Sequence, residues 1–286
     1  MEVESFPALF RGADAASNRH QSRYLLAIKV EYTLLVFASA ISLVFVKSQN
    51  GAIAFSIVLI LAIAVLFYRT LSKPEQDWYE CRALAESIKS MTWRYVMKSE
   101  PFLNDNARET FRDHLQELFS VNKSIAKKID PTWLEGDQIT DQMDRVRSFN
   151  LEGRLNHYSS SRVADQRTWY ANKARWNWKR SIIWSALVAL AYASACVLSI
   201  LRIKYSEFGF WPVDPAVVIA SSLIGWTQIK KYSELATAYK VPASEIGLII
   251  PKMNAVGDDE ALSEFVSKAE SAFSREHTMW VARQTS

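Results

Sequence analysis

Residues 181–201 read SIIWSALVALAYASACVLSIL, an apolar run without a charge that lies between Arg180 and Arg202. A helix needs about 20 apolar residues to cross the hydrocarbon core of a bilayer, and this run supplies them. Three further apolar runs occupy residues 32–46, 52–68 and 213–229. Buried helices of a soluble protein are the alternative interpretation. Four runs with basic outer ends, joined in pairs by short polar turns, favour two transmembrane hairpins.

The first and fourth runs are the least certain to fill a bilayer by length and hydropathy. Lys29 and Glu31 limit how far the first run extends toward the N-terminus, and the fourth begins with Asp214 and Pro215. As the return leg after the RIKYSEFGFWP turn, the fourth run is still predicted to span. We therefore predict an all-α membrane protein with two transmembrane helical hairpins, four spans in all, and long cytoplasmic helices.

Basic residues predict the orientation of these spans. They crowd the outer ends of both hairpins, whereas the hairpin tips hold only Lys47, Arg202 and Lys204. The outer ends carry Arg11, Arg19, Arg23, Lys29, Arg69, Lys73, Arg82, Lys173, Arg175, Lys179, Arg180, Lys230, Lys231 and Lys240. We therefore predict a multi-pass protein of the inner membrane, and the positive-inside rule places both of its termini in the cytoplasm. Because the net charge of +4 follows the span ends rather than a groove-reading motif, no nucleic-acid partner is expected.

The segments outside the runs have helical periodicity. Apolar residues recur at three- and four-residue steps over 74–97, and Asn106 with Glu109 has the spacing of a capping box at the start of a helix over 106–127. A long helix is predicted from about Asp137 into the third run, and a final one from Asp258 to about Arg283. The two halves share this outline, so we divide the chain into tandem domains, 1–130 and 131–286.

The sequence carries no catalytic signature. The four histidines are scattered over predicted helices, and neither HExxH, CxxC nor a glycine-rich phosphate loop occurs. We therefore predict a protein that is not an enzyme and that uses no cofactor and no metal.

Polar residues inside the spans are the candidates for lining a water-filled path in an oligomer. They are Ser185, Ser194 and Ser199 in the third run, and Asp214, Ser221, Ser222 and Thr227 in the fourth. The alternative for the hydroxyl groups is a hydrogen bond to their own helix or to a neighbouring helix. The alternative for Asp214 is a helix cap on the far side of the membrane.

Four arginines are candidates for binding a phosphate-bearing ligand: Arg145, Arg147, Arg154 and Arg162. A solvated, salt-bridged helix face is the alternative.

Three segments resemble one known family. They are DWYECRALAESIKSMTWRYVMKSEPF (77–102) with Arg82, Glu86 and Trp93, RVADQRTWYANKARWN (162–177) with Gln166, Trp169 and Tyr170, and EFVSKAESAFSREHTMW (264–280) with Glu270, Glu276 and Trp280. In this order around two hairpins they resemble SLATT domains, which are two-transmembrane effector domains associated with nucleotidyltransferase and SLOG sensor proteins in prokaryotic conflict systems. The resemblance covers nearly the whole chain as two tandem domains.

The resemblance implies an effector of antiphage defence by abortive infection. A sensor of the SLOG or nucleotidyltransferase type would detect infection, often through a nucleotide second messenger, and the hairpins would then form a homo-oligomeric pore or otherwise breach the bilayer. The alternatives are a scaffold without a pore that recruits a cytoplasmic partner, a housekeeping channel or transporter, and an enzyme with an intramembrane site.

Overall fold

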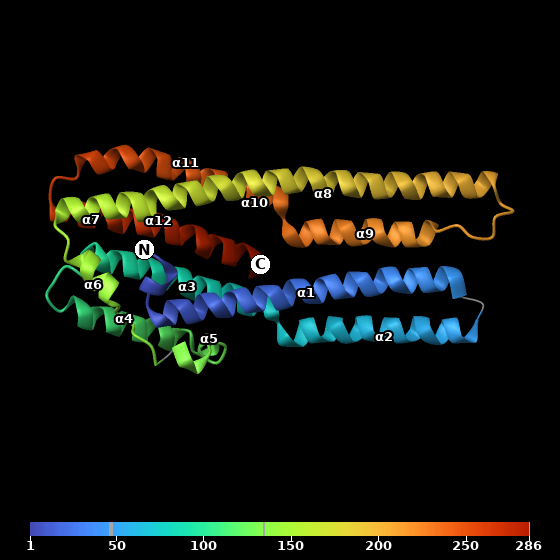
Figure 1. Cartoon of the computed structure of the whole chain (residues 1–286), viewed down its shortest axis with the longest axis horizontal. Coiled ribbons are helices and arrows are strands. Elements are labelled where there is room, and N and C mark those ends of the chain that lie inside the picture. The colour runs from blue at the N-terminus through green and yellow to red at the C-terminus, as the bar shows by residue number, and fades with distance from the viewer. Residues whose placement is uncertain (46–47, 134, 286) are drawn as a thin grey trace. The chain divides into compact units, whose positions relative to one another are not determined.

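The computed structural model describes residues 1–45, 48–133 and 135–285, without the side chains of 252, 254 and 274–285, and in these ranges it contains helices and no strand. The α-helices are α1 (Ala8–Phe45), α2 (Gln49–Ser72), α3 (Pro74–Val96), α4 (Ala107–Val121), α5 (Lys123–Ala126), α6 (Asp141–Arg147), α7 (Leu151–Tyr158), α8 (Asp165–Lys204), α9 (Val213–Lys230), α10 (Tyr232–Ala238), α11 (Lys240–Ile249) and α12 (Asp259–Thr285) (Figure 1). Three 3-10 turns, Val3–Ser5, Pro131–Trp133 and Ile250–Ala255, and the π turn, Ser159–Ala164, complete the described secondary structure.

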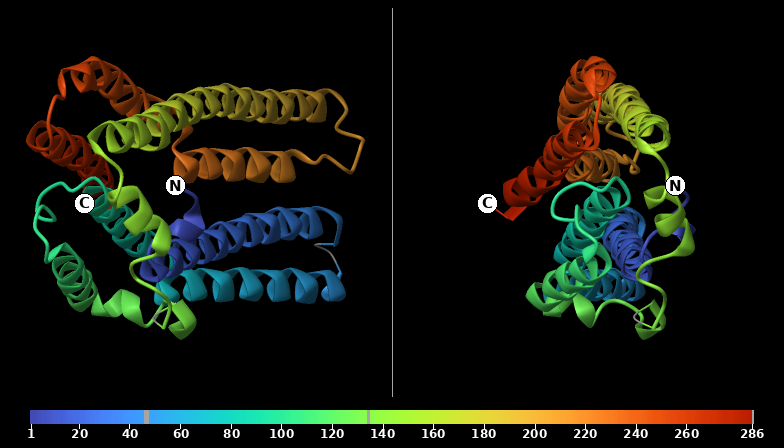
Figure 2. Two further views of the ribbon diagram at one scale, coloured as in Figure 1. Left: turned by 60° about the vertical axis from the view of Figure 1, so that its left-hand side comes forward. Right: turned by 90° about the vertical axis from the view of Figure 1, so that its left-hand side faces the viewer.

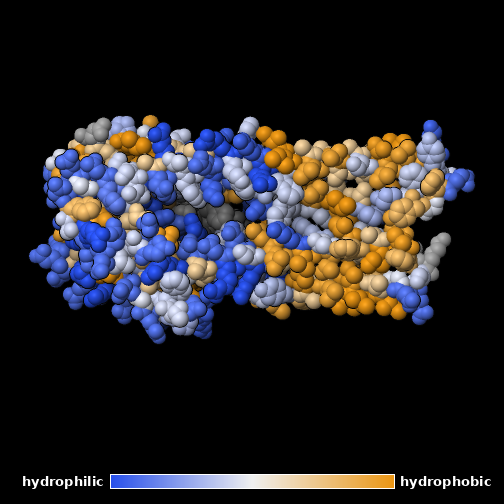
Figure 3. Space-filling view, in the orientation of Figure 1, coloured by the Kyte–Doolittle hydropathy of each residue, from blue (hydrophilic) through white to orange (hydrophobic). Residues whose placement is uncertain are grey.

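The chain divides into two compact units. Unit 1 consists of Met1–Ser22, Pro74–Tyr170 and Val241–Ser286, and unit 2 of Arg23–Lys73 and Ala171–Lys240. The surface of unit 2 is mostly hydrophobic over its helices, whereas that of unit 1 is mostly hydrophilic (Figure 3). This contrast is the one expected of a membrane-inserted part and a water-exposed part.

Unit 2 contains two helical hairpins. The second half of α1 lies beside α2, and α8 lies beside α9, in each view (Figures 1 and 2). Ser48 caps α2 by accepting a hydrogen bond from the Gly51 backbone N–H at 3.4 Å. Lys73 and Lys231 adopt left-handed backbone conformations, with φ of 42° and 45°, and so end α2 and α9.

Among the described residues, three helices are long and apolar enough to cross a membrane: α1, the helix that begins with α2 at Gln49, and the helix from Leu151 to Lys204 that includes α8. Length and composition thus agree with the predicted spans at 32–46, 52–68 and 181–201, although Val46 itself lies outside the described residues. Helix α9 matches the predicted fourth run in position, but Asp214, Gln228 and Lys230 lower its hydropathy and it is not among the three. A fourth span therefore stays a prediction.

Aromatic and glycine contacts hold α9 against its neighbours in unit 2. The Trp184 ring of α8 lies 6.0 Å from the Trp226 ring and stacks on Tyr232 at 6.4 Å. On α1, the Tyr32 ring lies so close to Gly225 that a Cβ atom there would come within 2.3 Å of the Tyr32 hydroxyl oxygen and 2.9 Å of its Cζ. A Cβ atom at this position would require the Tyr32 side chain to shift.

Unit 1 is built around α3, which packs along α12. Ser99 donates a hydrogen bond to the Ser263 carbonyl at 2.7 Å, and Arg94 donates one to the Ser271 hydroxyl at 2.8 Å. Trp93 is only 1% exposed and packs against Phe6, His157 and Tyr158, with ring centroids 5.7–6.4 Å apart. The repeated apolar positions of residues 74–97 therefore face a real core, as their spacing predicts.

Two predicted helix boundaries in unit 1 are wrong. The helix expected from about Asp137 is broken into α6 and α7, because Asn150 starts a new helix by accepting a hydrogen bond from the Gly153 N–H at 2.8 Å. The helix expected over 106–127 ends at Val121, and the Asn106 side chain makes no capping hydrogen bond. From Leu151, however, α7, the π turn and α8 form one unbroken helix as far as Lys204.

The close approach at Gly225 predicts a local sensitivity to added volume. Replacing Gly225 with Ala should lower the stability of the protein in detergent by about 1–3 kcal/mol, because the new methyl group overpacks the contact with Tyr32. Thermal unfolding of the full chain measures this as a lower midpoint temperature.

Gly209 is the matched control, since a Cβ atom there would meet nothing within 4 Å. The Gly209→Ala variant should unfold at the wild-type midpoint. Adding Tyr32→Phe to Gly225→Ala should recover part of the loss by removing the nearest atom. A Gly225→Ala variant as stable as the wild type would mean that Tyr32 does not pack there.

Candidate functional site

The three serines of α8 do not share one face. At about 100° per residue, Ser185 and Ser199 lie about 40° apart around the helix, whereas Ser194 lies on the opposite side from Ser185. All three are exposed, and Ser194 donates a hydrogen bond to the Leu190 carbonyl at 2.8 Å. Tyr192 and Cys196 fall on the face of Ser185 and Ser199. A single path along α8 can therefore be lined by Ser185 and Ser199 but not also by Ser194.

The polar candidates of α9 also lie on different faces of their helix. Asp214 and Ser221 are exposed and lie about 20° apart on one face, which also holds Gly225. Ser222 and Thr227 lie on other faces, where they donate hydrogen bonds to the carbonyls of Val218 and Ile224 at 2.8 and 2.7 Å.

Asp214 is not the cap residue of α9. Pro212 occupies the cap position, and Asp214 lies in the first turn, where the helix dipole favours a negative charge. Asp214 is exposed, which is compatible with a position at the mouth of a path.

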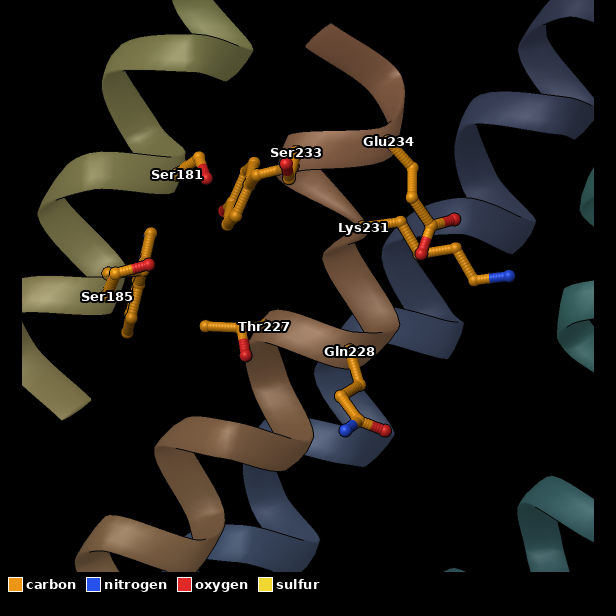
Figure 4. A pocket seen from close by; sticks show the side chains of 9 residues that line it. Ser181, Ser185, Thr227, Gln228, Lys231, Ser233 and Glu234 are labelled. Atoms are coloured by element: carbon orange, nitrogen blue, oxygen red, sulfur yellow. The ribbon is translucent and has the colours of Figure 1, made fainter. Parts of the chain in front are cut away.

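A cavity of about 230 Å³ lies between α8, α9 and α10 in unit 2. Its lining includes two of the candidates, Ser185 and Thr227, together with Ser181, Trp184, Gln228, Lys231, Tyr232, Ser233 and Glu234. Ser181 and Ser185 project from α8 toward the space that Thr227 faces from α9 (Figure 4). The structure thus brings together hydroxyl groups from the third and fourth runs at one end of the second hairpin.

Three of the four arginine candidates, Arg147, Arg154 and Arg162, make hydrogen bonds within unit 1. Arg147 donates a hydrogen bond to the Phe102 carbonyl at 2.8 Å, and its guanidinium lies 4.8 Å from the Tyr95 ring centroid. Arg154 is 2% exposed, bonds to the Met97 carbonyl at 3.0 Å and pairs with Asp259. Arg145 is exposed. A phosphate-bearing ligand would have to displace these contacts at Arg147 and Arg154, so their ligand role stays a prediction.

Arg162, the fourth candidate, forms a buried charge pair on the π turn. Its Nε and Nη2 atoms donate to the two carboxylate oxygens of Glu270 on α12 at 2.9 and 2.7 Å, and the Tyr158 hydroxyl donates to Glu270 at 2.9 Å. Glu270 is 0% exposed and Arg162 3%. Bidentate pairing of this kind is the strongest form of Arg–carboxylate contact.

The charge states of this cluster follow from its burial and its partners. Burial opposes the charge on Arg162, but the adjacent Glu270 carboxylate outweighs it and raises the pKa of Arg162. Burial, with Glu270 as the next cause, raises the pKa of Tyr158 well above its ordinary value, so Tyr158 stays a neutral donor. Burial lowers the pKa of the nearby Lys89, although Glu86 acts in the opposite direction. A π turn inside a long helix often marks a functional site, and Arg162 and Val163 of this turn are buried.

The family-motif residues with described side chains lie mostly in the core of unit 1. Arg82 pairs with Glu86 at 2.6 Å and with Asp14 of α1 at 3.0 Å. The side chains of Glu86, Trp93, Gln166, Tyr170 and Glu270 are buried, and Trp169 packs edge-on against Tyr170 at 5.1 Å. The side chains of Glu276 and Trp280 lie outside the described residues. The described motif residues therefore mark the packing of unit 1 rather than the apolar runs.

Sequence reasoning selected Arg162 and Glu270 for separate reasons and missed their pairing, as well as the part of Tyr158. These residues are more than a hundred positions apart along the chain, and no local pattern connects them. Within the part of the chain that the structure describes, no three His, Cys, Asp or Glu side chains are grouped so as to hold a metal ion.

The buried pair predicts a large effect of removing one charge. Replacing Glu270 with Ala should lower the stability of the full chain by about 3–5 kcal/mol, because it leaves the Arg162 guanidinium buried without its counter-ion. Thermal or denaturant unfolding in detergent measures the loss.

Glu264 on the same helix is the control, since it pairs with Lys268 on an exposed surface and its replacement by Ala should have little effect. A double variant, Arg162→Met with Glu270→Leu, should be more stable than Glu270→Ala because neither charge is then left alone. Equal stability of Glu270→Ala and Glu264→Ala would contradict a buried pair.

Comparisons with known proteins bear on both halves of the chain. Residues 7–155 match the family model of the SMODS and SLOG-associating 2TM effector domain 3, and residues 158–280 match that of the SMODS and SLOG-associating 2TM effector domain 1. No curated protein and no solved structure matches the chain. The matched ranges meet between residues 155 and 158, and our division at residue 130 stays a prediction. The chain belongs to the SLATT family, with two SLATT domains in tandem, and thus to the membrane effector domains linked to antiphage defence.

Proposed function

We propose that the protein is the membrane effector of a prokaryotic antiphage system and that, on a signal, it oligomerises and forms a pore in the inner membrane. The observation that carries the proposal is the exposed pair Ser185 and Ser199 on one face of the apolar run 181–201 of α8, in which most of the other exposed side chains are apolar. A polar stripe on such a helix is best accommodated against another polar surface or water. Several copies of the chain arranged around a water-filled path would supply both the water and the polar surfaces of neighbouring copies.

The second hairpin has further features that suit a path. Asp214 and Ser221 form an exposed polar face on α9, and the low hydropathy of this helix makes it the span least suited to full contact with lipid. A ring of Asp214 carboxylates at the outer mouth would attract cations. In this arrangement α9 completes the fourth span, and the termini and unit 1 lie in the cytoplasm, as the basic residues predict.

The π turn is the proposed link between signal and pore. Arg162 lies on this turn, which continues directly into α8, and Glu270 holds it from α12. A partner or ligand that binds better when this pair is rearranged would bias the helix that carries Ser185 and Ser199. A nucleotide second messenger or a SLOG- or nucleotidyltransferase-type sensor protein is the proposed source of the signal.

A membrane scaffold without a pore is the second candidate. It is favoured by the hydrogen bonds of Ser194, Ser222 and Thr227 to carbonyls of their own helices, which satisfy these hydroxyl groups without water. In that case unit 1 would recruit a cytoplasmic partner, and the hairpins would serve only as an anchor.

Membrane potential separates the two candidates. The full chain is induced in cells alone and then with its genomic neighbours and their trigger, while a voltage-sensitive dye reports the potential. A gated pore predicts collapse of the potential only when the neighbours and the trigger are present. A steady potential under all conditions, with the protein shown to be in the membrane fraction, would replace the pore with the scaffold.

The two faces of α8 give a sharper test of the path. Replacing Ser185 and Ser199 with Leu should reduce the leak rate by about tenfold or more, because the barrier rises when polar lining is lost. Ion flux from vesicles containing the purified protein measures the rate.

Ser194→Leu is the matched control, since it makes the same chemical change on the opposite face of the same helix and should leave the leak unchanged. Crosslinking of all variants checks that assembly is intact. If the control reduces the leak as much as the double variant, the path does not run along the Ser185 face.

A further inference from the structure

Two lysines from two helices of unit 2 lie beside one indole ring. The Nζ atom of Lys29 on α1 lies 5.6 Å from the ring centroid of Trp226, and that of Lys230 on α9 lies 5.7 Å from it. Lys230 also lies 5.9 Å from the Tyr232 ring centroid. We call Lys29, Lys230 and Trp226 the lysine cluster.

In the part of the chain that the structure describes, the positive charges of Lys29 and Lys230 are not balanced by a paired carboxylate. Among the described residues, neither Lys29 nor Lys230 has a carboxylate within the 4.0 Å of an ion pair, and Glu31, the acid nearest to Lys29 in sequence, pairs with Arg69 at 3.2 Å. Lys230 is also half-buried, which makes an unbalanced charge more costly. Like charges held around one ring are stable when an anion lies among them.

The position of the cluster along the helices indicates which anion is available. Lys29 precedes the apolar run that begins at Tyr32, and Lys230 follows the run that ends at Ile229. Both lie at the boundary between an apolar span and a polar segment, where Trp and Tyr side chains sit at the level of the lipid headgroups. Phospholipid phosphate groups occupy this level, and lysines near the surface attract the anionic ones.

We propose that the lysine cluster binds the phosphate group of an anionic phospholipid. Lysine ammonium groups donate to the phosphate oxygens, while Trp226 and Tyr232 provide an amphipathic wall beside the headgroup. Lys29 belongs to the first matched SLATT domain, and Lys230 and Trp226 belong to the second. The bound lipid therefore joins the hairpins of the two tandem domains, and this role does not depend on whether they form a pore.

Lipid binding by the purified full chain tests the proposal. Phosphatidylglycerol is titrated into the protein in neutral detergent, and native mass spectrometry counts retained lipid while thermal unfolding reports stabilisation. The wild type should retain phosphatidylglycerol and be stabilised by it, whereas zwitterionic phosphatidylcholine should have little effect. The double variant Lys29→Gln and Lys230→Gln should bind phosphatidylglycerol about 30-fold more weakly.

Two variants control for charge and folding. Arg202→Gln with Lys204→Gln removes the same charge from an exposed site at the far end of α8 and should bind as the wild type does. Lys29→Arg with Lys230→Arg keeps the charge and should retain most of the binding. Equal binding by the wild type and the Lys29→Gln, Lys230→Gln variant would overturn the proposal.

Inorganic phosphate distinguishes the two sources of the anion. If the ligand is a lipid, millimolar phosphate should neither stabilise the protein nor displace phosphatidylglycerol, because the acyl chains add to the affinity. Displacement of the lipid by phosphate at such concentrations would assign the cluster to a soluble phosphate ligand and overturn the lipid proposal.

Discussion

A buried charge must keep its partner, and the pair between Arg162 and Glu270 sets this constraint at the one place where the helix of residues 151–204 departs from α geometry. The π turn presents Arg162 to α12, and Tyr158 one turn earlier adds a third contact to the same carboxylate. Helix α12 is thereby fixed against α7 and α3, which in turn positions Trp93 and the aromatic core. The same turn leads directly into α8, the helix that carries the apolar run 181–201.

The membrane helices were the most predictable part of the structure, because a long apolar run has few alternatives once no water is present to bond its backbone. Boundaries in the polar segments were less predictable. Asn106 with Glu109 has the spacing of a capping box, yet Asn150, which carries no such signal, is the residue whose side chain caps a helix. Asparagine is a common N-cap residue, and tertiary packing decides which of these two asparagines caps a helix with its side chain.

Some properties of the candidate site residues were also predictable from the sequence, and others were not. The separation of Ser194 from Ser185 and Ser199 follows from the helical period and was within reach of the sequence alone. The occupation of Arg147, Arg154 and Arg162 by internal partners was not, because a sequence gives the sign of a charge but not its neighbour. Gly225 beside Tyr32 and Trp226 beside Lys29 join residues almost two hundred positions apart, and only packing reveals them.

Each compact unit draws segments from both tandem SLATT domains, so neither domain supplies a complete unit by itself. This arrangement has a consequence for how the two hairpins differ. The apolar runs of the first hairpin, residues 32–45 and 52–68, carry no charged or amide side chain, whereas α9 of the second hairpin carries Asp214 and Gln228 and packs through Gly225 and Trp226. A duplicated hairpin in which one copy stays lipid-compatible allows the other to acquire polar residues, since the first copy can keep the chain in the bilayer. Polar function in the membrane is therefore expected to concentrate in the second hairpin, which is where Asp214 and the exposed Ser185, Ser199 and Ser221 lie.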